Sequence, residues 1–440
     1  MHKSIDQNLD SGGRDTLGVL TFLHLGYLIG VPAISALVLV ALQNGYVLPL
    51  GAAKGVSLFL VILSSMLAVY DLLVKSVGVG GSWINSFVRL VVALGIMLIY
   101  TTAAISPLMA WDALSHWGLT GHNIATALAT EVPVSIDLFD HRHPPLIPTI
   151  YALFSAAPVS LFSIEWPSLF WIVCTQAIAH FLSCLLVIPM RYRLFSVLVV
   201  LQVPYVYNQL VHWGYTELPI LAYLIAAAYL LSTAKKLTVS ACLTALGLLL
   251  CASFFKNVAP LLALSILVAF CVARLSIFSW GAEWFKVKFP NRLLIRCFPI
   301  LIALCAISSI AWATWLHMGV ELKLFGKSLI LIAPEQSSVA KALASIFLEK
   351  ISYPLLLPIC LLGVWSWVTC RNEAHATRNY FLLHIACFLT VLIFASWFTE
   401  YGFSRASPDR DTGGTRHLFF PVFFWYVFCV ASVSSKLKLP

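Results

Sequence analysis

Side chains that can exchange protons or bind cations concentrate in one polar stretch of an otherwise apolar chain. The stretch covers residues 111–148, WDALSHWGLTGHNIATALATEVPVSIDLFDHRHPPLIP. Its titratable residues are Asp112, His116, His122, Glu131, Asp137, Asp140, His141, Arg142 and His143. Carboxylates and imidazoles serve as general acids and bases, and this density beside long apolar runs indicates the reactive face of a membrane enzyme.

Asp112 is the first candidate for a catalytic base. Trp111 and Trp117 flank it, and they could shield a carboxylate near a membrane surface. His116 follows at i+4, so the two side chains would share one helix face, where His116 could orient the carboxylate or contact substrate. The alternative is that Asp112 stabilises the N-terminus of a helix through the helix dipole, with His116 as a plain surface neighbour.

The pattern D-x-x-D-H-x-H places oxygen and imidazole ligands close together. Asp137, Asp140 and His141 are candidate ligands of a divalent cation, Mg²⁺ or Mn²⁺, and His143 is a candidate substrate contact. The alternative is a loop whose polar groups bind one another ahead of Pro144. The sequence indicates no other cofactor with certainty.

Four residues nearer the C-terminus are candidate substrate contacts. Glu217 in GYTELP opens an apolar run and could contact substrate or pair with Lys256; the alternative is a helix-terminal charge among headgroups. Lys256 lies between apolar runs on the expected outer side, where Lys is disfavoured, and this favours a phosphate partner over snorkelling to headgroups. Arg416 and His417 open the last apolar run after Gly413-Gly414, and Arg416 could also bind phosphate.

Composition predicts an all-α, polytopic membrane protein. The 440 residues are 60% hydrophobic and 10% charged, whereas soluble domains carry about 25% charged residues. Lys and Arg concentrate in short loops, so the net charge of +9 fits a positive-inside bias and not a nucleic-acid partner. The eleven cysteines lack metal-binding spacing and are interpreted as small buried apolar residues.

Apolar runs predict about twelve transmembrane helices in one domain, 1–440. The expected spans are 18–42, 51–74, 84–106, 167–190, 194–209, 216–233, 238–254, 258–273, 297–315, 351–370, 379–397 and 416–434. The proline-containing run 145–162 is expected to lie at the membrane surface, because crossing there would reverse the charge bias. Residues 107–163 then form a large outer loop, and 275–296 an amphipathic segment on the cytoplasmic side.

The order of these motifs resembles a known family. WDALSHW, HPPLIP, GYTELP, the Lys256-Asn257 pair and the Arg416-His417 pair together resemble the GT-C superfamily of polyprenyl-phosphate-sugar-dependent glycosyltransferases, which includes protein O-mannosyltransferases and aminoarabinose transferases. The resemblance implies two juxtamembrane helices, near 111–130 and 144–163, and a base at Asp112. Many relatives carry a D-x-D or E-x-D pair, whereas Asp112 is followed by Ala113 and Leu114.

The expected function is transfer of a sugar from a polyprenyl-phosphate donor to a lipid, glycan or protein acceptor. Membrane lipids are the expected surroundings, in a bacterial inner membrane with the site facing the periplasm or exterior. The alternative is a transporter or flippase of lipid-linked glycan without catalysis. Transporters place ionisable groups within their spans; His180 is the main such group expected here, which favours the enzyme.

Overall fold

The computed structural model describes residues 2–46, 48–76, 83–108, 114, 117–131, 144–156, 164–233, 238–256, 259–280, 361, 365, 376–397 and 419–437. In these ranges the regular elements are helices, which confirms the all-α expectation. They divide into two compact units, 1–226 with 254–256, and 227–253 with 257–440. Both contain apolar helices, and their expected union in one membrane domain remains a prediction.

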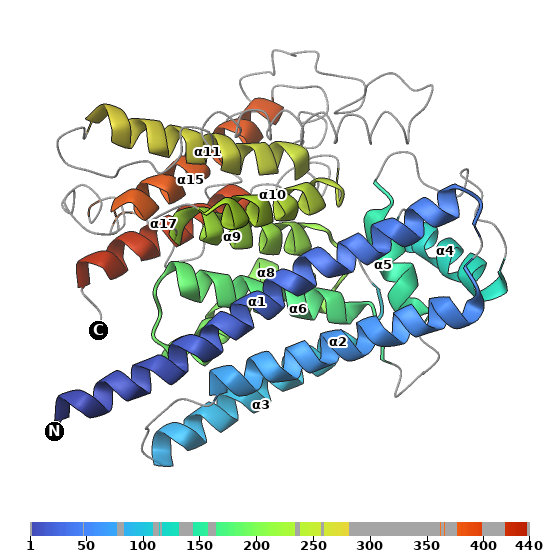
Figure 1. The fold of residues 1–440 in the computed structure, drawn as a ribbon, viewed down its shortest axis with the longest axis horizontal. Coiled ribbons are helices and arrows are strands. Elements are labelled where there is room, and N and C mark those ends of the chain that lie inside the picture. Colours follow the sequence, from blue (N-terminus) through green and yellow to red (C-terminus); the bar gives the residue numbers. More distant parts are fainter. Residues whose placement is uncertain are drawn as a thin grey trace. The chain divides into compact units, whose positions relative to one another are not determined.

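Long apolar helices dominate the first unit (Figure 1). They are α1 (His2–Gln43), α2 (Leu50–Ser76), α3 (Trp83–Ile105) and α6 (Ser168–Leu185). Among the described helices, these four contain segments long and apolar enough to cross a membrane, and in α1 that segment is Gly18–Leu42. The positions agree with the first four expected spans to within a few residues, apart from the C-terminal end of α6, and support a multi-pass membrane protein.

Helix α6 forms the centre of the first unit. Nearly all of its side chains are buried, including Trp171, Phe181 and His180, and it packs against α1, α2, α3 and α7 (Arg193–Leu201). Helix α3 differs, because large apolar side chains such as Trp83 and Phe87 are exposed along it. Because burying apolar surface is favourable, an exposed apolar helix face suits contact with lipid.

Two shorter helices, α4 (Gly118–Thr130) and α5 (Leu146–Ser155), pack together beside the α1–α2 turn (Figure 1). Helix α5 also contacts α1 and α2. Gly121 allows the close approach of α4, because an added Cβ would lie 2.5 Å from Cδ1 of Tyr151 and 3.0 Å from the carbonyl oxygen of Pro148.

The expectation of one continuous span over 194–209 is wrong, because the structure divides this run into two helices. The structure forms α7 and a second short helix, α8 (Pro204–Val211), with Val203 extended between them. Proline lacks an amide hydrogen and disfavours a helical conformation in the preceding residue, so the helix ends before Pro204 and a new one begins there. Apolar composition alone does not distinguish two short helices from one span.

The second unit contains part of α9 (Glu217–Thr233) together with α10 (Val239–Ser253), α11 (Ala259–Trp280), α15 (Ala376–Trp397) and α17 (Phe419–Leu437). Helix α11 packs on α10 and α15, and α15 packs on α17. Helix α11 continues past the expected boundary at 273 to Trp280. The remainder of the amphipathic segment 275–296, the span 297–315 and, apart from 361 and 365, the span 351–370 lie outside the described residues.

The contact between α4 and α5 can be tested by filling the space at Gly121. We expect Gly121→Ala to destabilise the protein by about 1–3 kcal/mol, because the new methyl group meets backbone and an aromatic ring. Thermal unfolding in detergent measures the effect. Gly95→Ala is the matched control, since an added Cβ there meets nothing within 4 Å. Equal midpoints for the two variants would contradict the packing of α4 on α5.

Candidate functional site

Two of the sequence-predicted site residues lie in the described part of the chain, Glu217 and Lys256, and they contact each other. Lys256 Nζ donates a hydrogen bond to Glu217 Oε1 at 2.5 Å. The exposed fractions of the two side chains are 7% for Lys256 and 0% for Glu217. Pairing with Lys256 is one of the roles that the sequence predicts for Glu217. A buried charge of either sign is costly unless an opposite charge meets it, so each residue stabilises the other.

Trp117 completes this group. The Lys256 ammonium lies 5.8 Å from the centre of the Trp117 ring, within the range of a cation–π contact. Trp117 is 3% exposed and immediately precedes α4. It is the last residue of the WDALSHW motif, so the structure joins this motif to GYTELP and to Lys256. We call Trp117, Glu217 and Lys256 the ion-pair site.

Hydrogen bonds from two tryptophans hold the backbone that precedes Glu217. Trp213 Nε1 donates to the carbonyl oxygen of Ser106 at 2.7 Å, just beyond the end of α3. Trp171 Nε1, in the first turn of α6, donates to the carbonyl oxygen of Tyr215 at 2.8 Å. Both rings are buried, and their centres are 5.6 Å apart. These contacts fix the start of α9 against the ends of α3 and α6.

Aromatic rings also surround the segment that carries Lys256. Phe255 lies edge-on to Tyr223, with ring centres 4.9 Å apart, and edge-on to Phe170 at 6.3 Å. Phe255 is fully buried, so the residue before Lys256 anchors this segment after α10 ends. The result is a carboxylate and an ammonium held by rigid, apolar surroundings. Such a pair can orient a polar ligand. A charged ligand can also replace one member of the pair as the partner of the other.

Glu131, an alternative acid in the outer loop, has a structural contact. Its Oε1 accepts a hydrogen bond from the backbone amide of Leu50 at 2.7 Å, at the first residue of α2. Glu131 itself ends α4 with a left-handed backbone, φ 54°. The carboxylate therefore satisfies an amide at a helix N-terminus, where negative charge is favourable, and ties α4 to α2.

The remaining predicted site residues lie outside the described residues. They are Asp112, His116, Asp137, Asp140, His141, His143, Arg416 and His417. Their roles as base, substrate contacts and cation ligands stay predictions.

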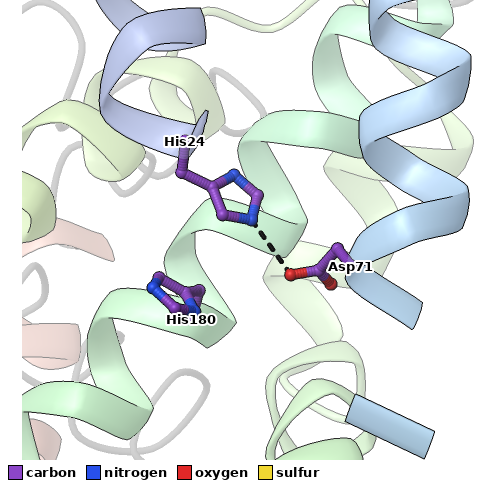
Figure 2. Close-up of side chains that lie close together, drawn as sticks. All are labelled: His24, Asp71 and His180. Carbon is purple, nitrogen blue, oxygen red and sulfur yellow. Dashed lines mark hydrogen bonds and ion pairs between the residues drawn. The ribbon is translucent and has the colours of Figure 1, made fainter. Parts of the chain in front are cut away.

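A second cluster of polar side chains lies between the long helices (Figure 2). His180 is the one member of this cluster that the sequence analysis singled out. His24 Nε2 lies 2.9 Å from Asp71 Oδ1, and Lys75 Nζ lies 2.7 Å from Asp71 Oδ2. The His180 ring stacks on His24 with centres 5.1 Å apart. All four side chains are buried. The expectation that His180 is the main ionisable group within the spans is therefore incomplete, because Asp71 and Lys75 lie buried near the C-terminal end of α2 at i,i+4 spacing.

This membrane cluster, defined as His24, Asp71, Lys75 and His180, includes three potential metal ligands. One ligand atom from each of His24, Asp71 and His180 lies within 4.8 Å of the others. Two features weigh against a divalent ion. Lys75 already pairs with the carboxylate, and donors around a transition metal at about 2.0–2.2 Å would have to lie closer together.

Comparison with protein-family models, curated proteins and solved structures finds no match for this chain. The resemblance to the GT-C superfamily therefore rests on the motifs and their arrangement.

The pairing of Glu217 with Lys256 can be measured by a double-mutant cycle. We expect Glu217→Gln and Lys256→Met each to destabilise the protein by about 3–5 kcal/mol, because each leaves its partner's charge buried. The double variant should be less destabilised than the sum, since neither charge remains. Thermal unfolding in detergent gives the comparison, with Lys54→Met at an exposed lysine of α2 as control. Additive effects would exclude the pair.

Proposed function

We propose that this chain is an integral membrane glycosyltransferase. It moves a sugar from a polyprenyl-phosphate donor to a lipid, glycan or protein acceptor on the extracytoplasmic face, most simply of a bacterial inner membrane. The observation that carries the proposal is the contact of Lys256 with both Glu217 and Trp117. Three separate segments of the GT-C-like motif set meet at these residues, although they are far apart in the sequence.

The chemistry assigns complementary roles to this site. Asp112, five positions before Trp117 in the same motif, acts as the base that accepts the proton of the acceptor hydroxyl. Lys256 and Arg416 bind the departing lipid phosphate, because positive charge stabilises the negative charge that develops there. Glu217 holds Lys256 in place and contacts the sugar. His116, His143 and His417 are further substrate contacts, and Asp137, Asp140 and His141 hold a cation if one takes part.

The buried ion pair allows Lys256 to exchange its partner Glu217 for a phosphate ligand. In the free protein Glu217 compensates the charge of Lys256 in apolar surroundings. A lipid phosphate arriving beside Trp117 would supply a second anion for the same ammonium. The aromatic rings around the pair exclude water, so the electrostatic attraction to phosphate is stronger than it would be in solution.

The arrangement of α4 and α5 supports the finer architecture that the resemblance implies. Helix α5 has ten residues and rises about 15 Å, half the thickness of the hydrocarbon core. It is too short to be a span, and it packs with α4 against α1 and α2. We assign α4 and α5 as the juxtamembrane helices of the first outer loop, in a GT-C-like fold of about twelve spans.

The alternative is a flippase or transporter of lipid-linked glycan. The membrane cluster favours it, because ionisable residues inside transmembrane helices are costly and commonly mark a transport pathway. The two proposals predict different products, a new glycosidic bond in one case and translocated donor in the other.

Transfer assays distinguish them. Protein in proteoliposomes is supplied with radiolabelled polyprenyl-phosphate sugars and a crude glycan or lipid acceptor extract. We expect transfer by the wild type, a loss of about 10²–10⁴-fold in Asp112→Asn and about 10²–10³-fold in Lys256→Met. Lys54→Met, which removes an exposed lysine of α2, should retain activity.

The results are interpreted for variants whose folding has been verified. Undiminished transfer by Asp112→Asn would remove Asp112 as the base. Undiminished transfer by Lys256→Met would exclude the ion-pair site from the reaction. Movement of labelled donor across the bilayer without any transfer product would replace the enzyme by the flippase.

A further inference from the structure

Asp71 in the membrane cluster contacts two different proton carriers at once. Its Oδ1 pairs with the imidazole of His24 and its Oδ2 with the ammonium of Lys75, at 2.9 and 2.7 Å (Figure 2 shows the first contact). His24 comes from α1, whereas Asp71 and Lys75 lie one turn apart on α2. The three residues form a continuous hydrogen-bonded chain between two helices.

The side chains of this hydrogen-bonded chain are fully buried. The exposed fractions of the His24, Asp71 and Lys75 side chains are each 0%. Tyr100 of α3 interacts electrostatically with Asp71, and Arg193 and Cys184 interact with Lys75. His180 of α6 stacks on His24 and shares a hydrogen bond with Thr21 at 2.9 Å. Among the described groups that act on Lys75, Asp71 is therefore the one carboxylate.

A single carboxylate in this environment can compensate one positive charge well, and a second would remain unbalanced. Burying an uncompensated ion costs several kcal/mol. Lys75 and a protonated His24 therefore compete for Asp71. The same reasoning disfavours a divalent metal, which would add two positive charges beside Lys75 and Arg193.

His24 is able to receive a proton on its second nitrogen. When Nε2–H donates to Asp71, Nδ1 carries a lone pair, and within the described part of the chain this buried atom has no hydrogen-bond partner. The same holds for Nδ1 of His180. A buried polar atom without a partner costs about 1–3 kcal/mol. Binding of a proton donor at this nitrogen would remove that cost.

We propose that His24, Asp71 and Lys75 form a proton-exchange relay between α1 and α2. A proton from water on one side of the membrane binds to Nδ1 of His24 and makes the ring an imidazolium, while the Lys75 ammonium gives up one proton to water beyond the C-terminal end of α2 and becomes a neutral amine. Asp71 transfers its main pairing from Lys75 to His24. The relay resets when the proton on Nε2 of His24 passes through Asp71 to the Lys75 amine, which restores a neutral ring and an ammonium. One proton enters and one leaves, so the net charge of the buried group is unchanged. The relay is independent of the proposed sugar transfer.

Nitrogen NMR of ¹⁵N-histidine-labelled protein in lipid tests the competition directly, with His24→Gln used to assign the His24 signals. In the wild type near neutral pH we expect a neutral His24 ring, because Lys75 pairs with Asp71. In Lys75→Met the His24 signals should move to those of an imidazolium, because Asp71 then lacks another cation. In Asp71→Asn/Lys75→Met they should return to a neutral ring. A neutral His24 in folded Lys75→Met would overturn the proposal.

Proton flux supplies the second measurement, in donor-free proteoliposomes with an internal pH dye and an imposed membrane potential. Wild type should acidify the interior faster than empty vesicles. His24→Gln keeps a donor to Asp71 but cannot carry the proton, so its rate should fall to that of empty vesicles. Ser35→Ala is the matched control on α1, since that buried hydroxyl bonds only to the carbonyl oxygen of Val31 among the contacts described.

Two further results would contradict the relay. Equal flux in wild type and folded His24→Gln would show that the ring transfers no proton. One equivalent of tightly bound divalent metal in purified wild type, lost in His180→Gln, would identify the cluster as a metal site instead.

Discussion

An ionised side chain inside an apolar helix bundle must meet an opposite charge, and this requirement organises the first unit of the protein. Glu217 and Lys256 meet it at one place, and Asp71 and Lys75 meet it at another, where His24 adds a second partner. The Glu217–Lys256 pair joins the start of α9 to the segment 254–256, and the contact of His24 with Asp71 joins α1 to α2. Because removing one partner leaves the other charge buried, such pairs are costly to alter.

The membrane cluster includes Asp71 and Lys75 in the last two turns of α2, a helix that Figure 1 shows beside α1. Glu131 of α4 caps α2 at Leu50, and Asp71 lies roughly 30 Å further along the same helix at a rise of 1.5 Å per residue. Trp117 of the ion-pair site immediately precedes α4, at the opposite end of that helix from Glu131. The proposed sugar transfer and the proposed proton exchange therefore use different residues of the first unit.

Much of this organisation could be predicted from sequence. Apolar run length identified α2, α3 and the apolar segment of α1 closely, and pairing with Lys256 was one of the roles expected for Glu217. The separation of α7 from α8 was missed because hydropathy averages over Pro204, although proline itself signals the break. Asp71 and Lys75 were visible as an i,i+4 pair, but their partners His24 and His180 come from other helices. Such long-range contacts depend on packing, which a single sequence does not encode.

We propose that the ion-pair site binds a polyprenyl phosphate. Cryo-electron microscopy of the full chain in lipid nanodiscs containing a polyprenyl phosphate tests it most directly. We expect phosphate density within hydrogen-bonding distance of Lys256 Nζ, beside the Trp117 ring, with the lipid chain leading from it into the bilayer. Phosphate density located instead against the membrane cluster, or a bound lipid that leaves Lys256 paired only with Glu217, would contradict the proposed glycosyltransferase site.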